Sequence, residues 1–154
     1  KHIGLIYNDH LVSLITFGKP RYNKKYEYEI LRFCTKKVTV VTGALSKLLK
    51  YFKETYNVES IITYADVRYG TGKSYELAGF KFIELTTPNY FYVNQDKRES
   101  RIKYQKHKLQ GLLKIFDSKL TEWENMQLNN IDRIWDCGSY SYGWRKKRIR
   151  LQNE

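Results

Sequence analysis

The stretch over residues 38–80 constrains the fold most, because its apolar side chains switch between the periods of helix and strand. Over residues 45–56 they recur every three or four positions, which predicts an amphipathic helix. A β-branched run over residues 38–41 precedes this helix and an apolar run over residues 60–65 follows it, and both have the length of strands. A short second helix is expected over residues 74–78, before a further strand. This alternation predicts a sheet with helices packed on it.

Shorter signals extend this sheet on either side. Strands are expected over residues 2–7, 11–17, 26–35, 81–85, 89–94 and 132–137, with an edge strand over residues 138–144. The first two should form a hairpin, as should the fourth and fifth. A helical pattern covers residues 109–128, with a break expected at Asp117 and Ser118 and a cap at Ser118 or Thr121. Thr121 and Glu124 have the spacing of a capping box. The predicted fold class is α+β, or layered α/β, with a mixed, largely antiparallel sheet and helices on its faces. One domain is expected over residues 1–144, followed by a basic tail over residues 145–154.

The balance of charge favours a polyanionic partner. The 154 residues contain 28 Lys or Arg and 16 Asp or Glu, which gives a formal net charge of +12. Solubility rarely needs so large an excess of one sign, so we expect nucleic acid as the partner ahead of a membrane or an acidic protein. The 14 tyrosines fit the same expectation, because their rings can stack on bases as well as fill a core.

Three basic segments supply the candidate contacts to nucleic acid. They are the loop over residues 18–25, the cluster over residues 97–108 and the tail over residues 145–150. The loop is equally well explained as a solvated hairpin connection, whereas the tail is typical of a segment that becomes ordered on a polyanion. The candidate nucleic-acid-binding residues are Lys19, Arg21, Lys24, Lys25, Arg98, Arg101, Lys103, Lys106, Arg145, Lys146, Lys147 and Arg148.

Other kinds of site have weaker signals. The three histidines and two cysteines are scattered without metal-site spacing, so we expect no metal. Cys34, in an apolar strand, is expected as a free thiol, which fits a reducing cytoplasm. Glu27 and Glu29 can either pair with nearby cations, which we expect, or supply a general base. Asp66 and Arg68 follow a strand end, where they form a local ion pair or carry function.

Two pieces of the chain carry a first resemblance. SKLLKYF, a following strand and SYELAGFKF resemble the coenzyme-binding half of the GCN5-related N-acetyltransferase fold. In that family a glycine-rich turn opens a helix, and the free N–H groups there bind the pyrophosphate of acetyl-CoA. The resemblance implies cofactor contacts at Gly43, Ala44 and Ser46, with Tyr75 protonating the departing thiolate and Glu29 as the base.

The turn itself departs from the family pattern. That pattern asks for Arg or Gln, then Gly, then Gly or Ala, where this chain has Val40, Gly43 and Leu45. Leu45 is expected to place a bulky side chain where the backbone must approach phosphate. Acetyl transfer with acetyl-CoA is therefore the alternative prediction, and an acetyltransferase-like scaffold without cofactor is the main one.

A second resemblance covers nearly the whole chain. GLIYNDHLVSLITFGKPRYNKKYEYEILRFC, TTPNYFYV and IWDCGSYSYGW, among other pieces, are similar to a domain that follows nuclease domains in phage and mobile-intron homing endonucleases. The resemblance implies a DNA-binding module in a phage-infected bacterial cytoplasm, with a nuclease domain elsewhere in a longer chain. It implies no catalytic residue within this domain.

Overall fold

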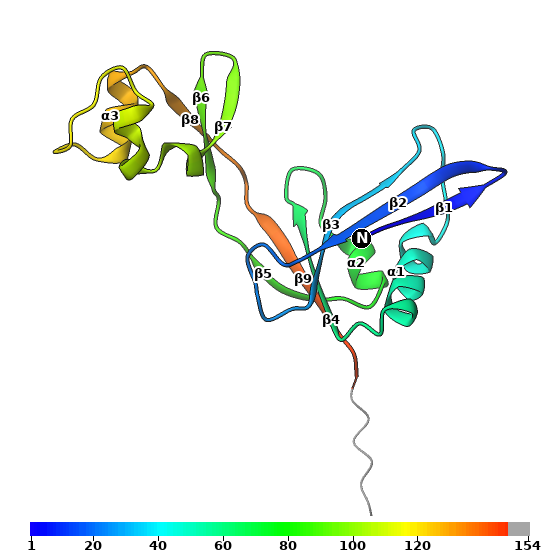
Figure 1. Cartoon of the computed structure of the whole chain (residues 1–154). Helices are drawn as coiled ribbons and strands as arrows, with labels where there is room; N and C mark the ends of the chain where they lie inside the picture. Colours follow the sequence, from blue (N-terminus) through cyan, green and yellow to red (C-terminus); the bar gives the residue numbers. More distant parts are fainter. Residues whose placement is uncertain (148–154) are drawn as a thin grey trace, which may run out of the picture. The chain divides into compact units, whose positions relative to one another are not determined.

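The computed structural model describes residues 1–147, which form two compact units (Figure 1). Unit 1 consists of Lys1–Thr86 together with the segment that begins at Ser139, and unit 2 is Thr87–Gly138. Unit 2 is therefore inserted into unit 1 along the sequence. Whether the two units fold as the one domain expected over residues 1–144 stays a prediction.

Unit 1 is a six-stranded mixed sheet with two helices. The strands are β1 (His2–Tyr7), β2 (His10–Gly18), β3 (Tyr28–Thr35), β4 (Ser60–Asp66), β5 (Lys81–Leu85) and β9 (Ser139–Arg145), and the helices are α1 (Ala44–Thr55) and α2 (Lys73–Leu77). The strand order is β1-β2-β3-β4-β9-β5, in which β3 and β4 are parallel and all other neighbours are antiparallel. This confirms the predicted α+β class with a mixed, largely antiparallel sheet.

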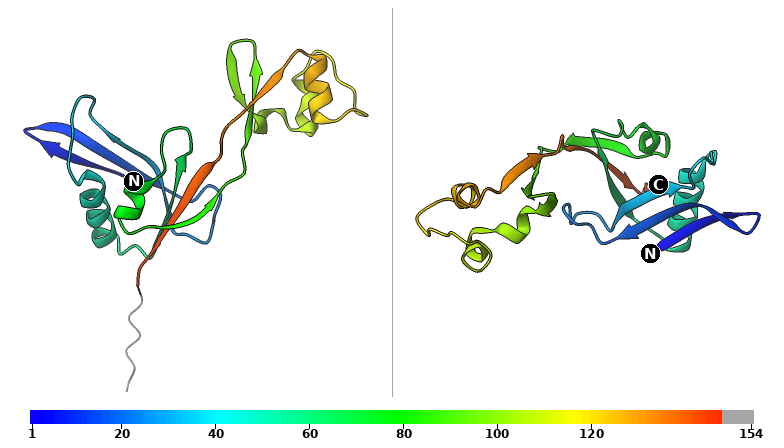
Figure 2. Two further views of the ribbon diagram at one scale, coloured as in Figure 1. Left: turned by 180° about the vertical axis from the view of Figure 1, so that it is seen from behind. Right: turned by 90° about the horizontal axis from the view of Figure 1, so that it is seen from above.

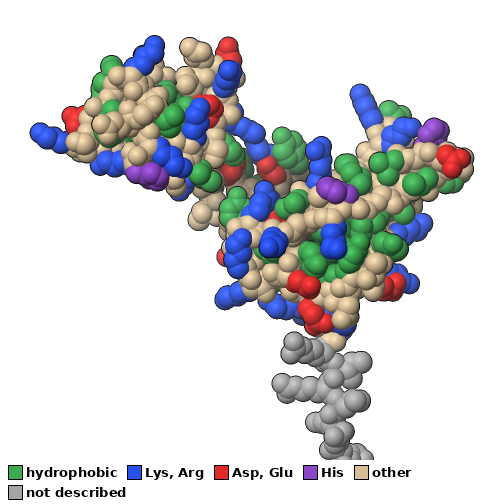
Figure 3. All heavy atoms as spheres, in the orientation of Figure 1, with side chains coloured by type: hydrophobic (Ala, Val, Ile, Leu, Met, Phe, Trp, Pro, Cys, Tyr) green, Lys and Arg blue, Asp and Glu red, His purple; other side chains and the backbone are tan. Residues whose placement is uncertain are grey.

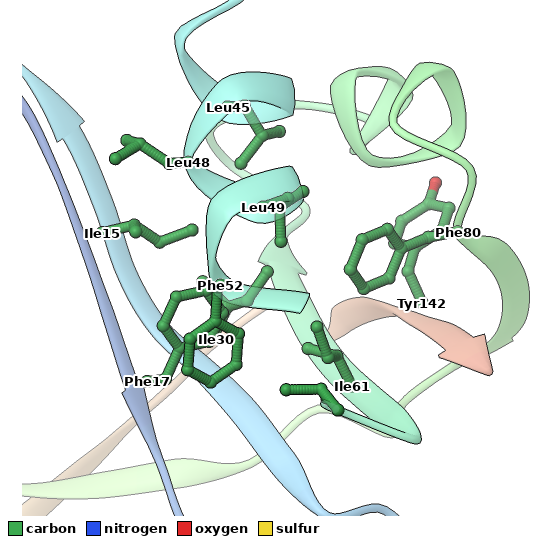
Figure 4. Packing of buried hydrophobic residues seen from close by; sticks show 11 residues of the cluster. Ile15, Phe17, Ile30, Leu45, Leu48, Leu49, Phe52, Ile61, Phe80 and Tyr142 are labelled. Atoms are coloured by element: carbon green, nitrogen blue, oxygen red, sulfur yellow. The ribbon is translucent and has the colours of Figure 1, made fainter. Parts of the chain in front are cut away.

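The core of unit 1 lies between α1 and the sheet. The predicted apolar stripe is buried, since Leu45, Leu48, Leu49 and Phe52 are at most 8% exposed. Figure 4 shows these side chains pointing toward residues of β2, β3 and β4. The rings of Phe17 and Phe52 stack with their centroids 3.6 Å apart. Residues of α2 pack against the same cluster, so both helices cover one face of the sheet.

Unit 2 is a three-stranded antiparallel sheet with one α-helix. Its elements are β6 (Tyr90–Asn94), β7 (Lys97–Ser100), two 3₁₀ helices at Arg101–Tyr104 and Lys106–Gly111, α3 (Glu122–Leu128) and β8 (Asp132–Trp135), with strand order β7-β6-β8. The predicted capping box is confirmed, because Thr121 and Glu124 bond each other's backbone N–H groups. The core gathers around Tyr92, Leu109 and Met126, each with no exposed surface.

A buried amide organises the loop before α3. The Asn125 side chain is fully buried, and its oxygen accepts the Asp117 N–H at 2.8 Å. Its nitrogen donates to the carbonyl oxygens of Asp117 at 2.9 Å and of Thr121 at 3.0 Å. A single side chain therefore takes the place of backbone pairing at Asp117, where a break in the helical pattern is expected, whereas residues 112–116, expected as helix, are not helical.

Four expectations about the strands are wrong. Residues 38–41 form a loop, in which Val38 is 97% exposed, because β-branched composition gives no partner strand. The expected hairpin of residues 81–94 does not form, since β5 pairs with β9 and β6 pairs with β7 and β8. The strand expected at an edge, β9, lies between β4 and β5. Strict alternation along β3 places Phe33 on the face opposite to Tyr28 and Ile30. The pairing of β3 with β2 shifts register between Thr16 and Phe17, and Phe33 packs against the same core cluster as Tyr28 and Ile30.

Some simple features of the described residues bear on function. No helix within residues 1–147 is long and apolar enough to cross a membrane. Over the same range no three His, Cys, Asp or Glu side chains are grouped as metal ligands would be. Cys34 is half-buried and Cys137 is exposed, and both are free thiols.

Candidate functional site

The central parallel pair of unit 1 is paired along only part of its length. β3 and β4 share three register pairs, of which Ile30 with Thr63 is the last. Beyond it, within the described residues, β3 continues to Thr35 with only β2 beside it, and β4 continues to Asp66 with only β9. The backbone N–H and C=O groups on the facing edges of the two strands therefore have no ladder partner. We call this open stretch, between residues 31–35 of β3 and residues 64–66 of β4, the fork.

A buried hydroxyl without a partner lies at the start of the fork. Thr63 is 1% exposed, and its Oγ1 finds no hydrogen bond among residues 1–147. It occupies the last rung of the β3–β4 pair, between Ile30 on one side and Tyr142 on the other. A buried unpaired hydroxyl costs about 1–3 kcal/mol. A residue of this kind marks a place where a ligand could supply the missing bond.

The first turn of α1 offers free N–H groups. No side chain caps this helix, its first turn has no acidic residue, and the N–H groups of Leu45 and Ser46 find no acceptor within residues 1–147. Gly43 begins the helix at φ 70°, and open space surrounds the position where its Cβ would be. Ala44 is buried and donates its N–H to the Val41 carbonyl at 3.2 Å. The expectation that the Leu45 side chain covers the turn is wrong, because this side chain lies in the core (Figure 4).

A groove of about 460 Å³ lies between α1 and α2, which are side by side in unit 1 (Figure 2). Lys53 lies in it with its Nζ 3.9 Å from the centroid of the Trp144 ring and 5.5 Å from that of Phe80. Burial lowers the pKa of Lys53 to about 8, and contact with the two rings acts the other way by favouring the ammonium. The groove is lined by Ser46, Leu49, Lys50, Lys53, Glu54, Leu77, Ala78 and Gly79.

Tyr75 belongs to α2 and packs against the edge of the core. Its ring lies 5.9 Å from Phe80 and 6.0 Å from Tyr142, and no hydrogen bond engages its hydroxyl within the described residues. The start of α2 is fixed by Tyr142, whose hydroxyl donates to the Thr71 carbonyl at 2.5 Å. Gly72 is required beside this ring, because a Cβ there would lie 2.3 Å from it and the backbone has φ 76°.

Glu29 is held in a buried ion pair. Its carboxylate has no exposed surface and accepts three hydrogen bonds from Arg21, from the backbone N at 2.7 Å, Nε at 2.8 Å and Nη2 at 2.6 Å. Tyr28 and Ile30 point to the α1 face, so Glu29 points to the opposite face. The structure therefore does not bring Glu29 to the groove, and the expected pairing with a cation is what it shows. Glu27, the other acid, accepts the Glu59 N–H at 2.8 Å.

The basic residues predicted in unit 1 lie at two connected places. Arg145 donates to the Lys25 carbonyl at 3.1 Å and its guanidinium lies 4.5 Å from the Tyr26 ring, which links the end of β9 to the loop over residues 19–25. Lys19 and Lys25 are exposed, and Lys24 donates to the Pro20 carbonyl. Lys146 bonds Asn57 at 2.7 Å, Lys147 is exposed, and Arg148 lies outside the described residues.

The basic residues predicted in unit 2 are not gathered on one surface of that unit. Arg98 lies over the Phe91 ring at 4.6 Å, whereas Arg101 lies over the Tyr90 ring at 5.1 Å, and neighbouring residues of β6 point to opposite faces. Lys103 forms an ion pair with Glu99 at 2.6 Å. Figure 3 shows Lys and Arg side chains spread over both units on the face that it presents. Lys106 is exposed.

Sequence reasoning missed Thr63, Lys50 and Lys53. A threonine in an apolar strand has no signal that tells a paired hydroxyl from an unpaired one. The two lysines follow Ser46 at positions +4 and +7, so the helical period alone could have placed all three on one side of α1.

Asp66 and Arg68 form a local ion pair at 2.6 Å, and the arginine holds the pKa of the Asp66 carboxyl below its usual value.

Comparisons with known proteins give a likeness at the level of structure. No protein-family model matches the chain, and no curated protein matches it. A solved structure described as an acetyltransferase of the GNAT family from Bacillus anthracis is 18% identical, with a TM-score of 0.48. The match covers 94% of this chain and 66% of that one, so this chain spans just under two thirds of the neighbour's length.

Proposed function

We propose that unit 1 binds acetyl-CoA, as the coenzyme-binding part of an N-acetyltransferase-like protein. The observation that carries the proposal is the fork, with the unpaired Thr63 hydroxyl at its last rung. An extended ligand with amide groups would meet backbone donors and acceptors on both sides of the fork, much as an added strand would. The pantetheine arm of acetyl-CoA is a ligand of that kind.

The anionic end of the coenzyme fits the neighbouring helix. The free N–H groups of Leu45 and Ser46 and the positive end of the α1 dipole favour a phosphate. Lys50 and Lys53 line the adjacent groove and would supply positive charge to further phosphates. Gly43 leaves the approach to the helix open.

When bound, acetyl-CoA supplies a thioester as acyl donor. Tyr75, whose hydroxyl has no hydrogen bond within residues 1–147, would give its proton to the departing thiolate. Glu29 is fixed by Arg21 on the other face of the sheet and serves to hold the loop over residues 19–27. The amine that would accept the acetyl group therefore has no base assigned among these residues.

The proposal is tested by calorimetry with acetyl-CoA and the full chain. Lys50→Gln should weaken binding about tenfold, the loss of one charged contact to phosphate, whereas Lys47→Gln should leave it within twofold. Lys47 is the matched control, because it lies on the same helix but lines a different groove. No detectable binding by the unaltered chain, or equal effects of the two variants, would exclude the proposal.

Thr63→Val should raise the stability of the free protein and lower its affinity for acetyl-CoA. Valine has nearly the same shape but no hydroxyl, so the free protein should become more stable by about 1 kcal/mol. Acetyl-CoA binding should become weaker, since the ligand loses a bond inside the fork. Greater stability with unchanged affinity would show that the hydroxyl does not contact the coenzyme.

Binding of duplex DNA is the second candidate, as the module of a phage or mobile-element homing endonuclease-type protein. The observation that favours it is the contact of Arg145 with Lys25 and Tyr26, which joins the basic loop and the end of β9 in one surface. The net charge of +12 adds a general attraction to polyanions. Cations at these positions would contact phosphates and carry no base specificity by themselves.

A salt series with duplex DNA tests this candidate. Replacing Lys24 and Lys25 by Gln should reduce the slope of log affinity against log salt by about 2, one for each phosphate contact. The matched control replaces Lys36 and Lys37 by Gln. These two lysines are exposed at the other end of β3, and their replacement removes the same amount of charge. Affinity that hardly changes with salt would rule the candidate out.

A further inference from the structure

Unit 2 carries a cluster of arginines held on aromatic rings. The guanidinium carbon of Arg133 lies 3.9 Å from the centroid of the Trp123 ring, 5.3 Å from Tyr90 and 5.5 Å from Trp135. Arg101 lies on Tyr90 as well, at 5.1 Å, and the rings of Tyr90 and Trp135 are 4.9 Å apart. We call these five residues the arginine–aromatic surface.

The backbone explains why these side chains meet. Tyr90 and Trp135 are opposite each other in the register of β6 and β8, and Arg133 is two residues before Trp135, so all three share one face of the sheet. Trp123 reaches the same face from the first turn of α3, next to the core of this unit. The strands β6 and β8, the helix α3 and, for Arg101, the 3₁₀ helix Arg101–Tyr104 therefore position the surface.

The guanidinium groups of Arg101 and Arg133 are not paired with a carboxylate among the described residues. Within residues 1–147 neither forms an ion pair, and Arg101 has only the side-chain oxygen of Asn89, at 3.3 Å. Most carboxylates of unit 2 have hydrogen-bond partners other than these arginines. Glu99, Asp117, Glu124 and Asp136 accept hydrogen bonds from a lysine or from backbone N–H groups. Glu122 accepts from the hydroxyls of Tyr92 at 2.7 Å and of Tyr90, a member of the surface, at 3.3 Å. A guanidinium stacked on a ring keeps its N–H donors at its edge, where an anion can accept them.

The arginine–aromatic surface also presents an exposed aromatic ring, that of Trp135. Trp135 is 53% exposed although it contacts Tyr90 and Arg133, so part of its indole is open to solvent. An open indole beside two unneutralised guanidinium groups matches a partner that carries both flat rings and phosphates. Single-stranded nucleic acid has both, whereas an acidic peptide lacks the bases and a duplex keeps its bases stacked internally.

We propose that the arginine–aromatic surface of unit 2 binds single-stranded nucleic acid, with a base stacked on Trp135 and phosphates on Arg101 and Arg133. The surface belongs to unit 2, whereas the acetyl-CoA site and the duplex-binding loop belong to unit 1, and this proposal does not depend on either of those. Of the basic residues that the sequence singles out in this unit, the surface contains Arg101 and leaves out Arg98, Lys103 and Lys106. Arg98 lies over Phe91, and Lys103 is neutralised by Glu99.

The test uses fluorescence anisotropy with the full chain, a labelled 15-nucleotide single strand of DNA or RNA, and a duplex of the same length. Trp135→Leu should weaken binding of the single strand about 5- to 150-fold, the loss of one stacked base. Trp135→Phe retains a ring and should stay within about fivefold of the unaltered chain. Lys119→Gln is the matched control for charge in the same unit and should change affinity less than twofold, since Lys119 is exposed and contacts no ring.

Three results would overturn the proposal. The first is an unaltered affinity in Trp135→Leu, and the second is an equal loss in the Leu and Phe variants, which would indicate a role in folding alone. The third is a single strand that is displaced by polyglutamate as readily as by unlabelled oligonucleotide, because the surface would then recognise charge only. Arg133→Lys, which keeps the charge but loses the planar fork, should weaken binding by at least as much as Lys119→Gln does. A preference for the DNA or the RNA strand identifies which of the two the surface takes.

Discussion

The buried ion pair of Arg21 and Glu29 predicts an unequal response to truncation of its two partners. The Glu29 side chain has no exposed surface, whereas that of Arg21 is 58% exposed. Arg21→Ala leaves a buried carboxylate with one remaining donor, the backbone N–H at position 21. Glu29→Gln leaves a guanidinium that can turn to water, and the neutral amide oxygen can still accept the same backbone N–H.

The magnitudes follow from these exposures. Stranding a buried charge costs about 3–5 kcal/mol, and because Arg21 borders solvent, water can enter after truncation, so we expect about 2–4 kcal/mol for Arg21→Ala. Glu29→Gln loses two charge-assisted bonds to an exposed partner, for which we expect about 1–2 kcal/mol. The double variant removes the stranded charge and should be more stable than Arg21→Ala alone.

Urea unfolding followed by circular dichroism at pH 7 measures all three variants. Lys19→Ala is the control, because it removes an exposed cation from the same loop and should change the free energy of unfolding by less than about 0.5 kcal/mol. The reasoning is refuted if Glu29→Gln costs more than Arg21→Ala, or if the double variant is the least stable of the three. Either result would mean that the carboxylate is not the buried, dependent member of the pair.

Three further predictions concern single positions. Asn125→Ala removes the bonds that hold the loop before α3 and should cost about 3 kcal/mol in thermal unfolding, with faster amide exchange in that loop; protection equal to that of the unaltered chain would contradict this. Gly72→Ala should cost at least about 2 kcal/mol, against about 1 kcal/mol for Gly43→Ala, because both have positive φ but only Gly72 lies against a tyrosine ring; equal costs would argue against the close approach. Lys53 should titrate near pH 8 in carbon-detected NMR, because burial lowers its pKa from the ordinary lysine value of 10.5. Between these two pH values the unfolded state holds the extra proton, so the free energy of unfolding should rise with pH across that interval; titration together with the other lysines would contradict this.

Local patterns predicted elements of both units well where residues close together in the sequence decided the outcome. The stripe over residues 45–56 predicted α1 because helical spacing alone buries it. The turn before β2 was predicted as well, and Asn8 and Asp9 adopt positive φ there, which their short polar side chains tolerate. The capping box at Thr121 was predicted for a similar reason, since its two residues lie three apart.

Pairing between distant segments could not be predicted in the same way. Residues 138–144 are rich in turn-forming residues, and nothing in them indicates that β9 enters between β4 and β5. Residues 81–94 have the pattern of a hairpin, but the strands belong to different sheets because the chain leaves unit 1 between them. The fork and the arginine–aromatic surface depend on such pairings, so their residues carried no signal beyond their types.

The position of β9 has a consequence for synthesis of the chain. β9 lies between β4 and β5, but all of unit 2 precedes it in the sequence. During synthesis β5 is therefore made before β9, the strand with which it pairs, and it stays unpaired until more than fifty further residues have been made. A nascent chain stalled just before Ser139 should leave β5 and the region around α2 open to protease, and release of a few more residues should close the sheet in one step.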